Sequence, residues 1–354
     1  MNRLTEKIKP GGSGLLVALI VIVILFLGST AGAVAGENSV GMLLKTQGDV
    51  KIFPWGNRPR PGLPLEDLFA GNEVATGSGA TATLVLFAGG REYALTPNTR
   101  VRIYADRIEK VAGNVQSGRP GVALNLPEGS KIKSLRLMGE TTRNGSVFSI
   151  HSPVSGSTIR EGAYTFRWSF KADPDRVTVI IRDFDLWHNA DIDKVDLIEL
   201  EEKATVARLP VSGTSLSYPP PGLAPLKAGG RYSLYVVPMG PGDRVEDVIV
   251  DGYPESEFYV LPEKERDVLR EKEKAVEDLS RKNPADPVPL MKLARIYIEM
   301  DLYDEALNTA LRLQKMMPEN PNVYRMMAGI YSRMGMPGKR DEAKRKAQKL
   351  ERKI

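Results

Sequence analysis

Acidic side chains are concentrated at one place in the chain, where their chemistry could hold a metal ion. Carboxylates at this density are ligands that a hard cation such as Ca²⁺ prefers. The residues concerned are Asp183, Asp185, His188, Asp191, Asp193 and Asp196. Their spacing departs from the D-x-D-x-D-G order of a calcium-binding loop, and we predict that the segment is a loop. We therefore expect no metal site, and an enzyme built on this loop is the least favoured hypothesis.

Other residues that could carry out catalysis lack their companions. Ser130 and Lys133 match the S-x-x-K motif of penicillin-interactive enzymes, but the S-D-N and K-T-G motifs are missing. The sequence also lacks G-x-x-x-x-G-K, G-x-S-x-G and H-E-x-x-H. It contains no cysteine and two histidines, which excludes disulfides and thiolate metal sites. We expect a protein that is not an enzyme and binds no cofactor.

The N-terminus predicts export. Arg3, Lys7 and Lys9 precede the uncharged apolar run Leu15–Leu27, and Ala33-Val34-Ala35 follows it. A basic region, a short apolar core and an A-x-A site are typical of a secretory signal peptide. If the segment is not cleaved, the uncharged stretch 15–36 is long enough to anchor the chain in the inner membrane. Either reading of residues 1–36 makes the rest of the chain periplasmic or exported.

Composition and charge limit the remaining choices. With 354 residues, 42% of them hydrophobic and 26% charged, the chain is long enough for two or three globular domains. Its net charge of +5 is small for its length. Nucleic-acid-binding proteins usually concentrate far more positive charge, so no nucleic-acid partner is expected.

The first predicted domain, residues 38–148, has short apolar runs separated by glycine-rich turns, which predicts a small β domain. Gly89-Gly90 predicts a tight hairpin, and Ala80–Phe87 predicts a strand with one buried face. Residues 105–148 are predicted to be irregular β structure or a connector. The expected strands are Met42–Leu44, Val50–Phe53, Glu73–Thr76, Ala82–Phe87, Glu92–Leu95 and Val101–Tyr104.

These residues resemble the FecR domain, a periplasmic β domain of bacteria. The resemblance rests on Gly48-Asp49-Val50, Trp55, Pro61–Leu65, Gly71–Gly77, Ala80–Phe87 and Leu95–Val101. FecR-type regulators also carry a cytoplasmic anti-sigma segment. Only about 14 residues of this chain could lie inside the cell if residues 15–36 form an anchor. The resemblance therefore implies a binding or scaffold module and not a sigma regulator.

The second predicted domain, residues 149–261, resembles an immunoglobulin or fibronectin type III sandwich. Tyr164, Phe166 and Trp168 alternate along one strand, so they share a face, and we expect them in the core rather than in a sugar-binding platform. The other expected strands are Val177–Arg182, Thr205–Leu209, Leu216–Tyr218, Arg231–Val237 and Glu257–Leu261.

The third predicted domain, residues 262–354, is helical. Glu263–Lys282 predicts a charged helix, and residues 287–320 resemble a tetratricopeptide repeat, with a weaker second repeat from Pro321. Such repeats offer a concave groove for peptides and helices. The residues proposed to bind a protein partner are Tyr297, Tyr324, Met327 and Tyr331. Since fewer than three repeats rarely fold alone, this region must pack on the sandwich, on another chain or on a partner helix.

The end of the chain is strongly basic. Residues 339–353 contain eight basic and three acidic side chains. We expect a solvated helix face, with contact to anionic lipid or to a cell-wall polymer as the alternative.

The sequence thus predicts a multidomain fold, β and then α: a signal or anchor helix, a FecR-like domain, an immunoglobulin-like sandwich and tetratricopeptide-like hairpins. The leading hypothesis is an extracytoplasmic adaptor whose β domains dock on an envelope component and whose helices bind a protein. On this hypothesis, removing residues 263–354 abolishes a protein contact and leaves the β domains folded. The alternative is a cell-wall or glycan-binding module, which co-sedimentation with peptidoglycan would test.

Overall fold

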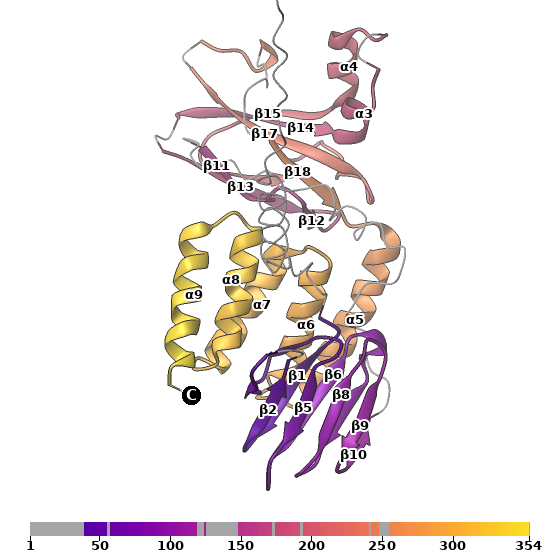
Figure 1. Cartoon of the computed structure of the whole chain (residues 1–354). Helices are drawn as coiled ribbons and strands as arrows, with labels where there is room; N and C mark the ends of the chain where they lie inside the picture. The colour runs from indigo at the N-terminus through magenta and orange to yellow at the C-terminus, as the bar shows by residue number, and fades with distance from the viewer. Residues whose placement is uncertain are drawn as a thin grey trace, which may run out of the picture. The chain divides into compact units, whose positions relative to one another are not determined.

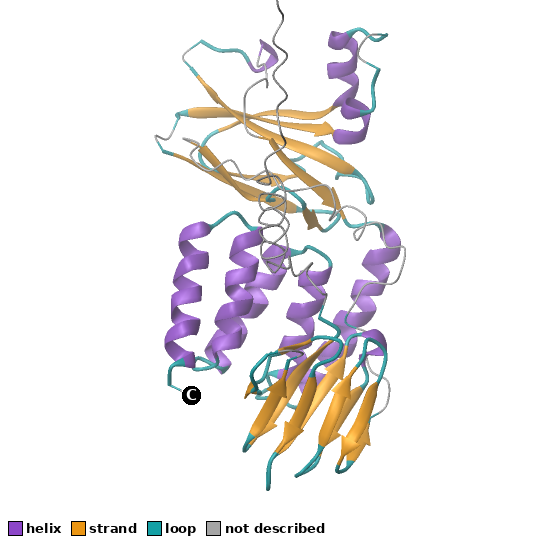
Figure 2. Ribbon diagram, in the orientation of Figure 1, coloured by secondary structure: helices purple, strands orange, loops and turns teal. Residues whose placement is uncertain are grey.

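The computed structural model describes residues 39–54, 57–118, 124, 148–171, 174–191, 194–240, 242–247 and 255–353. Within the chain, residues 39–354 form one compact unit. Strands fill its N-terminal and middle parts and helices its C-terminal part, which confirms the predicted order of β and then α (Figures 1 and 2). The predicted signal or anchor, residues 1–36, lies outside the described residues. No helix of the described part is long and apolar enough to cross a membrane.

The first β domain consists of two five-stranded antiparallel sheets that share one core. One sheet has the order β10-β7-β6-β1-β4 and the other β3-β2-β5-β8-β9. The strands of the first sheet are β1 (Gly41–Gln47), β4 (Asp67–Leu68), β6 (Thr81–Leu86), β7 (Glu92–Leu95) and β10 (Val115–Ser117). Those of the second are β2 (Val50–Phe53), β3 (Arg60–Pro61), β5 (Glu73–Thr76), β8 (Arg100–Ile103) and β9 (Ile108–Ala112).

All six predicted strands of this domain are present, and β9 and β10 continue it beyond residue 105. The hairpin predicted at Gly89-Gly90 joins β6 and β7, and both glycines have positive φ, 75° and 60°. The turn is longer than the tight turn predicted, because Ala88–Gly90 forms a short 3-10 helix. Residues 119–123 and 125–147, which include Ser130 and Lys133, lie outside the described residues.

One prediction for β6 was wrong. The strand was expected to bury a single face, but Leu84 and Leu86 are buried in the core between the sheets while Val85 and Phe87 are buried on the other face. The second pair belongs to a core that includes the C-terminal helices. Strict alternation fails here because both faces of the sheet are covered.

The sandwich domain has a three-stranded sheet, β11-β13-β16, and a five-stranded sheet, β12-β18-β17-β14-β15, around one core. Phe166 and Trp168 are buried in that core and Tyr164 packs against it, as predicted. The strands are β11 (Phe148–Ser152), β12 (Ser157–Ile159), β13 (Tyr164–Phe170), β14 (Arg176–Asp183), β15 (Thr205–Val211), β16 (Ser215–Tyr218), β17 (Arg231–Met239) and β18 (Glu255–Val260).

The segment after β14 is not the loop that was predicted. It contains two short helices, α3 (Phe184–His188) and α4 (Leu197–Ala204). Arg182, at the end of β14, ties them to the sheet: it donates to Glu201 at 2.7 Å and lies 4.3 Å from the centre of the Trp187 ring. The polar composition of this segment predicts a loop. The local signal for the helices is the pair of capping residues, Asp183 and Asp196.

The described C-terminal part of the chain contains five helices. The first of them has the bounds predicted for the charged helix, Glu263–Lys282. The helices are α5 (Glu263–Lys282), α6 (Val288–Glu299), α7 (Tyr303–Met316), α8 (Pro321–Arg333) and α9 (Pro337–Glu351). The side chain of Asn320 caps α8 by accepting from Asn322 N. Pro321 and Pro337 occupy first-turn positions, where a missing N–H costs nothing.

The helices pack on both β domains of the same chain. Their core includes Met42 and Phe87 of the first domain and Val154 and Leu261 of the sandwich end. A backbone hydrogen bond of 3.0 Å from Thr158 N to Asp301 O also joins the sandwich to the helices. The helical region therefore packs its apolar surface against both β domains of the same chain.

Candidate functional site

A cavity of about 530 Å³ lies between the first β domain and the helices. This volume is in the range of ligand-binding clefts. The β domain contributes Met42, Arg60, Leu65, Glu66, Asp67 and Phe69. The helices contribute Arg295, Ile298, Tyr303, Asn322, Arg325, Met326, Gly329, Ile330 and Arg333. The lining combines apolar side chains with six charged ones.

One face of α8 supplies most of the helical lining. Asn322, Arg325, Gly329 and Arg333 are spaced by three or four residues, so they lie along one side of the helix. Gly329 leaves the middle of this face open, since a Cβ atom there would meet no other atom within 4 Å. The cavity exists partly because this position has no side chain.

A segment of the first β domain already occupies part of this face. Asn322 donates from its side-chain nitrogen to Pro64 O at 3.0 Å and to the Glu66 carboxylate at 2.9 Å. Arg60 and Arg325 also pair with Glu66, at 2.6 and 3.3 Å. Glu66 is 6% exposed, so its charge is balanced by close donors rather than by water. Part of the groove is thus already filled by a turn, in which Glu66 N donates to Leu63 O at 3.1 Å and Leu65 has a φ of 66°.

The unpaired polar groups around the rest of the cavity are donors. The Nε atoms of Arg60 and Arg295 are buried and have no acceptor among the described residues. Arg333 makes no ion pair with the part of the chain that the structure describes. Burial raises the pKa of Asp67, with Arg295 opposing that rise. Of these groups, the Arg333 guanidinium is the one with which a ligand that brings acceptor atoms would pair.

The four residues proposed from the sequence to bind a partner are buried in the helical core. The exposed fractions are 8% for Tyr297, 6% for Tyr324, 5% for Met327 and 9% for Tyr331. Tyr297 donates a hydrogen bond of 2.7 Å to Glu273. The pKa of Tyr297 is raised, mainly by burial and in addition by this hydrogen bond. These side chains pack helices together, and their role in binding a partner remains a prediction. The sequence reading did not name the neighbouring face of α8, whose signal is the spacing of Asn322, Arg325 and Gly329.

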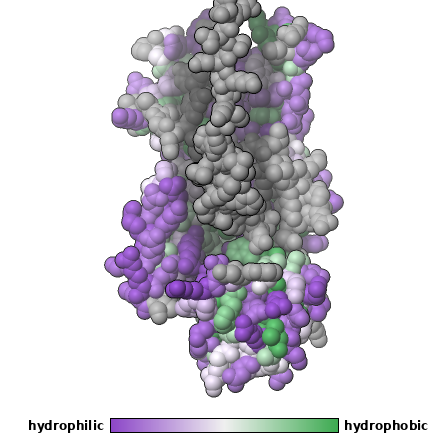
Figure 3. Space-filling view, viewed as in Figure 1, coloured by the Kyte–Doolittle hydropathy of each residue, from purple (hydrophilic) through white to green (hydrophobic). Residues whose placement is uncertain are grey.

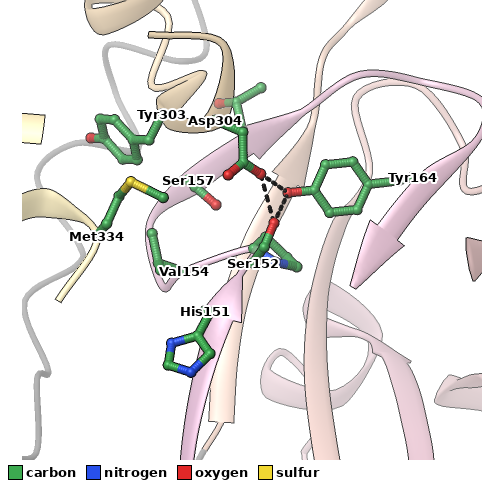
Figure 4. A pocket seen from close by; sticks show the side chains of 10 residues that line it. His151, Ser152, Val154, Ser157, Tyr164, Tyr303, Asp304 and Met334 are labelled. Carbon is green, nitrogen blue, oxygen red and sulfur yellow. Dashed lines mark hydrogen bonds between the residues drawn. The ribbon is translucent and has the colours of Figure 1, made fainter. Parts of the chain in front are cut away.

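A second contact joins the helices to the sandwich domain. Ser152 and Tyr164 both donate to Asp304 Oδ2, at 2.6 and 2.7 Å, beside a cavity of about 10 Å³ (Figure 4). Arg167 donates to the other oxygen of Asp304 at 3.1 Å. Burial raises the pKa of Tyr164, so its hydroxyl remains a donor. The cavity has room for about one water molecule, and the cluster serves as a polar joint between α7 and the sandwich.

The aspartates considered as metal ligands have structural partners instead. Asp183 caps α3 by accepting from Leu186 N, and Asp196 caps α4 by accepting from Ile198 N at 2.8 Å. Asp191 pairs with Lys194 at 2.6 Å, and Asp193 lies outside the described residues. Among the described residues, no group of three or more His, Cys, Asp or Glu side chains could hold a metal ion.

The capping role of Asp196 has a measurable consequence. Replacing it by alanine should destabilise the protein by about 1 kcal/mol, because two backbone N–H groups lose their acceptor. Asp196→Asn should keep almost the full stability, since asparagine also caps helices well. Thermal unfolding of the parent and both variants, with and without Ca²⁺, distinguishes a helix-capping role of Asp196 from a metal-binding role. Stabilisation of the parent by Ca²⁺ that both variants lose would show a metal site instead.

No protein-family model matches this chain, and a search of curated proteins finds no match.

Proposed function

We propose that this chain is a non-enzymatic, extracytoplasmic adaptor or scaffold. Its FecR-like domain and immunoglobulin-like sandwich dock on an envelope component, and its tetratricopeptide-like helices bind a protein partner in the cavity facing α8. The observation that carries the proposal is that cavity, where apolar side chains lie beside charged ones, among them Arg333, which has no ion-pair partner among the described residues. An extended peptide with apolar side chains and acceptor groups fits this chemistry.

The contacts inside the chain support a scaffold role. The groove binds Pro64 through its carbonyl oxygen and Glu66 through its carboxylate, which are the kinds of contact that a partner peptide offers. Ion pairs such as Lys45–Asp286, at 2.9 Å, and Arg160–Glu305, also at 2.9 Å, connect the helices to each β domain. A binding site held between such contacts keeps its shape before a partner arrives.

The sandwich domain supports the immunoglobulin-like part of the proposal. It has two facing sheets, and the Tyr232 hydroxyl accepts a hydrogen bond of 3.0 Å from Lys227 N, five residues upstream. A tyrosine early in a late strand that bonds back to the upstream backbone is the tyrosine corner of such sandwiches.

Filling the cavity should remove partner binding without unfolding the protein. In Gly329→Leu, the new side chain enters open space on the α8 face, and leucine is a good helix former. We expect capture of the protein partner from envelope extracts to fall at least about tenfold, the effect of about 1.4 kcal/mol, with no loss of thermal stability.

Gly338→Leu is the matched control. Gly338 is also helical, and a Cβ atom there also meets no atom within 4 Å, but it does not line the cavity. It should keep every partner of the parent protein. If Gly329→Leu binds the same partners in the same amounts as Gly338→Leu, the cavity is not the binding site and the proposal fails.

A further inference from the structure

From Lys344 to its end, the last helix presents a basic outer side. Ala343, Ala347 and Leu350 are buried against the other helices. Arg345, Lys349 and Arg352 lie on the opposite side, because residues spaced by four and seven positions share a helix face. All three are exposed, and hydrophilic residues cover α9 in Figure 3. This basic stripe, Arg345, Lys349 and Arg352, is about 10 Å long.

Most basic side chains on α9 have no ion-pair partner among the described residues, although Asp341 lies one turn before Arg345 and interacts with it. Of the eight basic residues at 339–353, only Arg340 makes an ion pair with the described residues, to Asp341 at 2.8 Å. Glu351, the acid beside the stripe, is bound by Arg325 of α8 at 2.8 Å. Like charges at i,i+4, such as Arg345 and Lys349, destabilise a helix. An external anion would relieve this repulsion.

Helix α5 shows what a solvated charged helix looks like in this protein. It carries seven acidic and seven basic residues. Its exposed charges pair with each other along the helix, as Arg270 does with Asp267 and Arg281 with Asp278. Helix α9 is therefore unusual within the same chain, and ordinary solvation does not explain its one-sided charge.

We propose that the basic stripe of α9 binds the headgroups of an anionic phospholipid membrane. The stripe carries no exposed apolar or aromatic side chain, so it can lie on a charged surface but has nothing to insert into it or to stack on a sugar. The apolar segment Leu15–Leu27 is expected to bring the chain to a membrane during export. This contact is separate from the cavity and does not depend on the partner that the cavity binds.

Vesicle co-sedimentation tests the proposal with residues 37–354, which contain the whole compact unit. The vesicles are phosphatidylcholine alone or a mixture with about equal phosphatidylglycerol. A basic residue near an anionic surface contributes roughly fivefold to partitioning. Binding to the mixed vesicles should fall about 100-fold when Arg345, Lys349 and Arg352 are all replaced by glutamine. It should also fall at high salt, where the Debye length is short.

The control carries the same change in charge on α5, with Arg270, Lys274 and Lys282 replaced by glutamine. It should bind mixed vesicles as the parent does. The lipid assignment is wrong if the α5 and α9 variants lose binding equally. It is also wrong if the parent binds vesicles with and without phosphatidylglycerol to the same extent. It is also wrong if the parent binds a soluble polyanion such as heparin through the stripe but no vesicle, since the ligand is then a polymer.

Discussion

Deletion of the helical region, residues 263–354, is expected to leave a first β domain that aggregates and no longer unfolds cooperatively. The deletion uncovers the outer face of the first sheet, where Met42, Leu44, Val85 and Phe87 are buried. Each such side chain contributes about 1.5–3 kcal/mol when buried, so the loss is comparable to the whole stability of a typical domain. Circular dichroism melting and size-exclusion chromatography measure the effect. This expectation replaces the sequence-based one, in which the β domains stay folded.

A pair of substitutions tests whether the exposed apolar sheet face, and not truncation in general, causes the aggregation. Val85→Thr with Phe87→Lys makes the outer face polar, which suits a sheet facing water. The pair should restore a soluble, cooperatively folding domain in the truncated chain and should destabilise the full-length chain. If the unaltered truncated chain is monomeric and melts like the intact protein, the helices do not support the sheet.

Replacing Glu66 by alanine should destabilise the protein by about 2 kcal/mol. The substitution removes the acceptor shared by Arg60, Arg325 and Asn322 at a position where the Glu66 side chain is 7% exposed. The buried amide of Asn322 loses a hydrogen-bond acceptor, whereas the Arg60 and Arg325 side chains, 40% and 44% exposed, can be hydrated. Urea denaturation of the full chain gives the change in the free energy of unfolding.

The matched control is Asp278→Ala on α5. Asp278 pairs with Arg281 at 3.1 Å, but the two side chains are 51% and 72% exposed. The free energy of unfolding should change by no more than about 0.5 kcal/mol, as for other exposed pairs. A double-mutant cycle with Asn322→Ala measures the coupling across the interface. Equal losses for Glu66→Ala and Asp278→Ala would show that the Glu66 cluster contributes no more than a surface pair.

Local sequence patterns were sufficient where an element buries only one of its faces. The alternation of Phe166 and Trp168 predicted a buried strand face, and the charge pattern of 263–282 predicted α5 with correct bounds. The pattern failed at Val85 and Phe87, because the surface that buries them comes from helices far along the chain. Helices α3 and α4 were missed although Asp183 and Asp196 are standard capping residues.

Three of the residues predicted to bind a partner lie on α8, but on a different face from the one that lines the cavity. Tyr324, Met327 and Tyr331 match the repeat pattern because they hold the helices together, and a repeat pattern records packing more strongly than binding. The cavity also needs Arg60 and Glu66 of the first domain. No local spacing relates these residues to α8, so only the folded chain shows that they share a site.

The contacts between the first β domain and the helical region join residues that lie far apart in the sequence. This separation sets the order in which parts of the protein can fold. Glu66 is separated from Asn322 by 256 residues, and Lys45 from Asp286 by 241. A chain that emerges from its N-terminus forms its first sheets long before α8 exists. Contacts of such large separation form slowly, so an apolar sheet face stays exposed while the rest of the chain is synthesised. A holding factor that shields this face during synthesis would therefore raise the yield of folded protein.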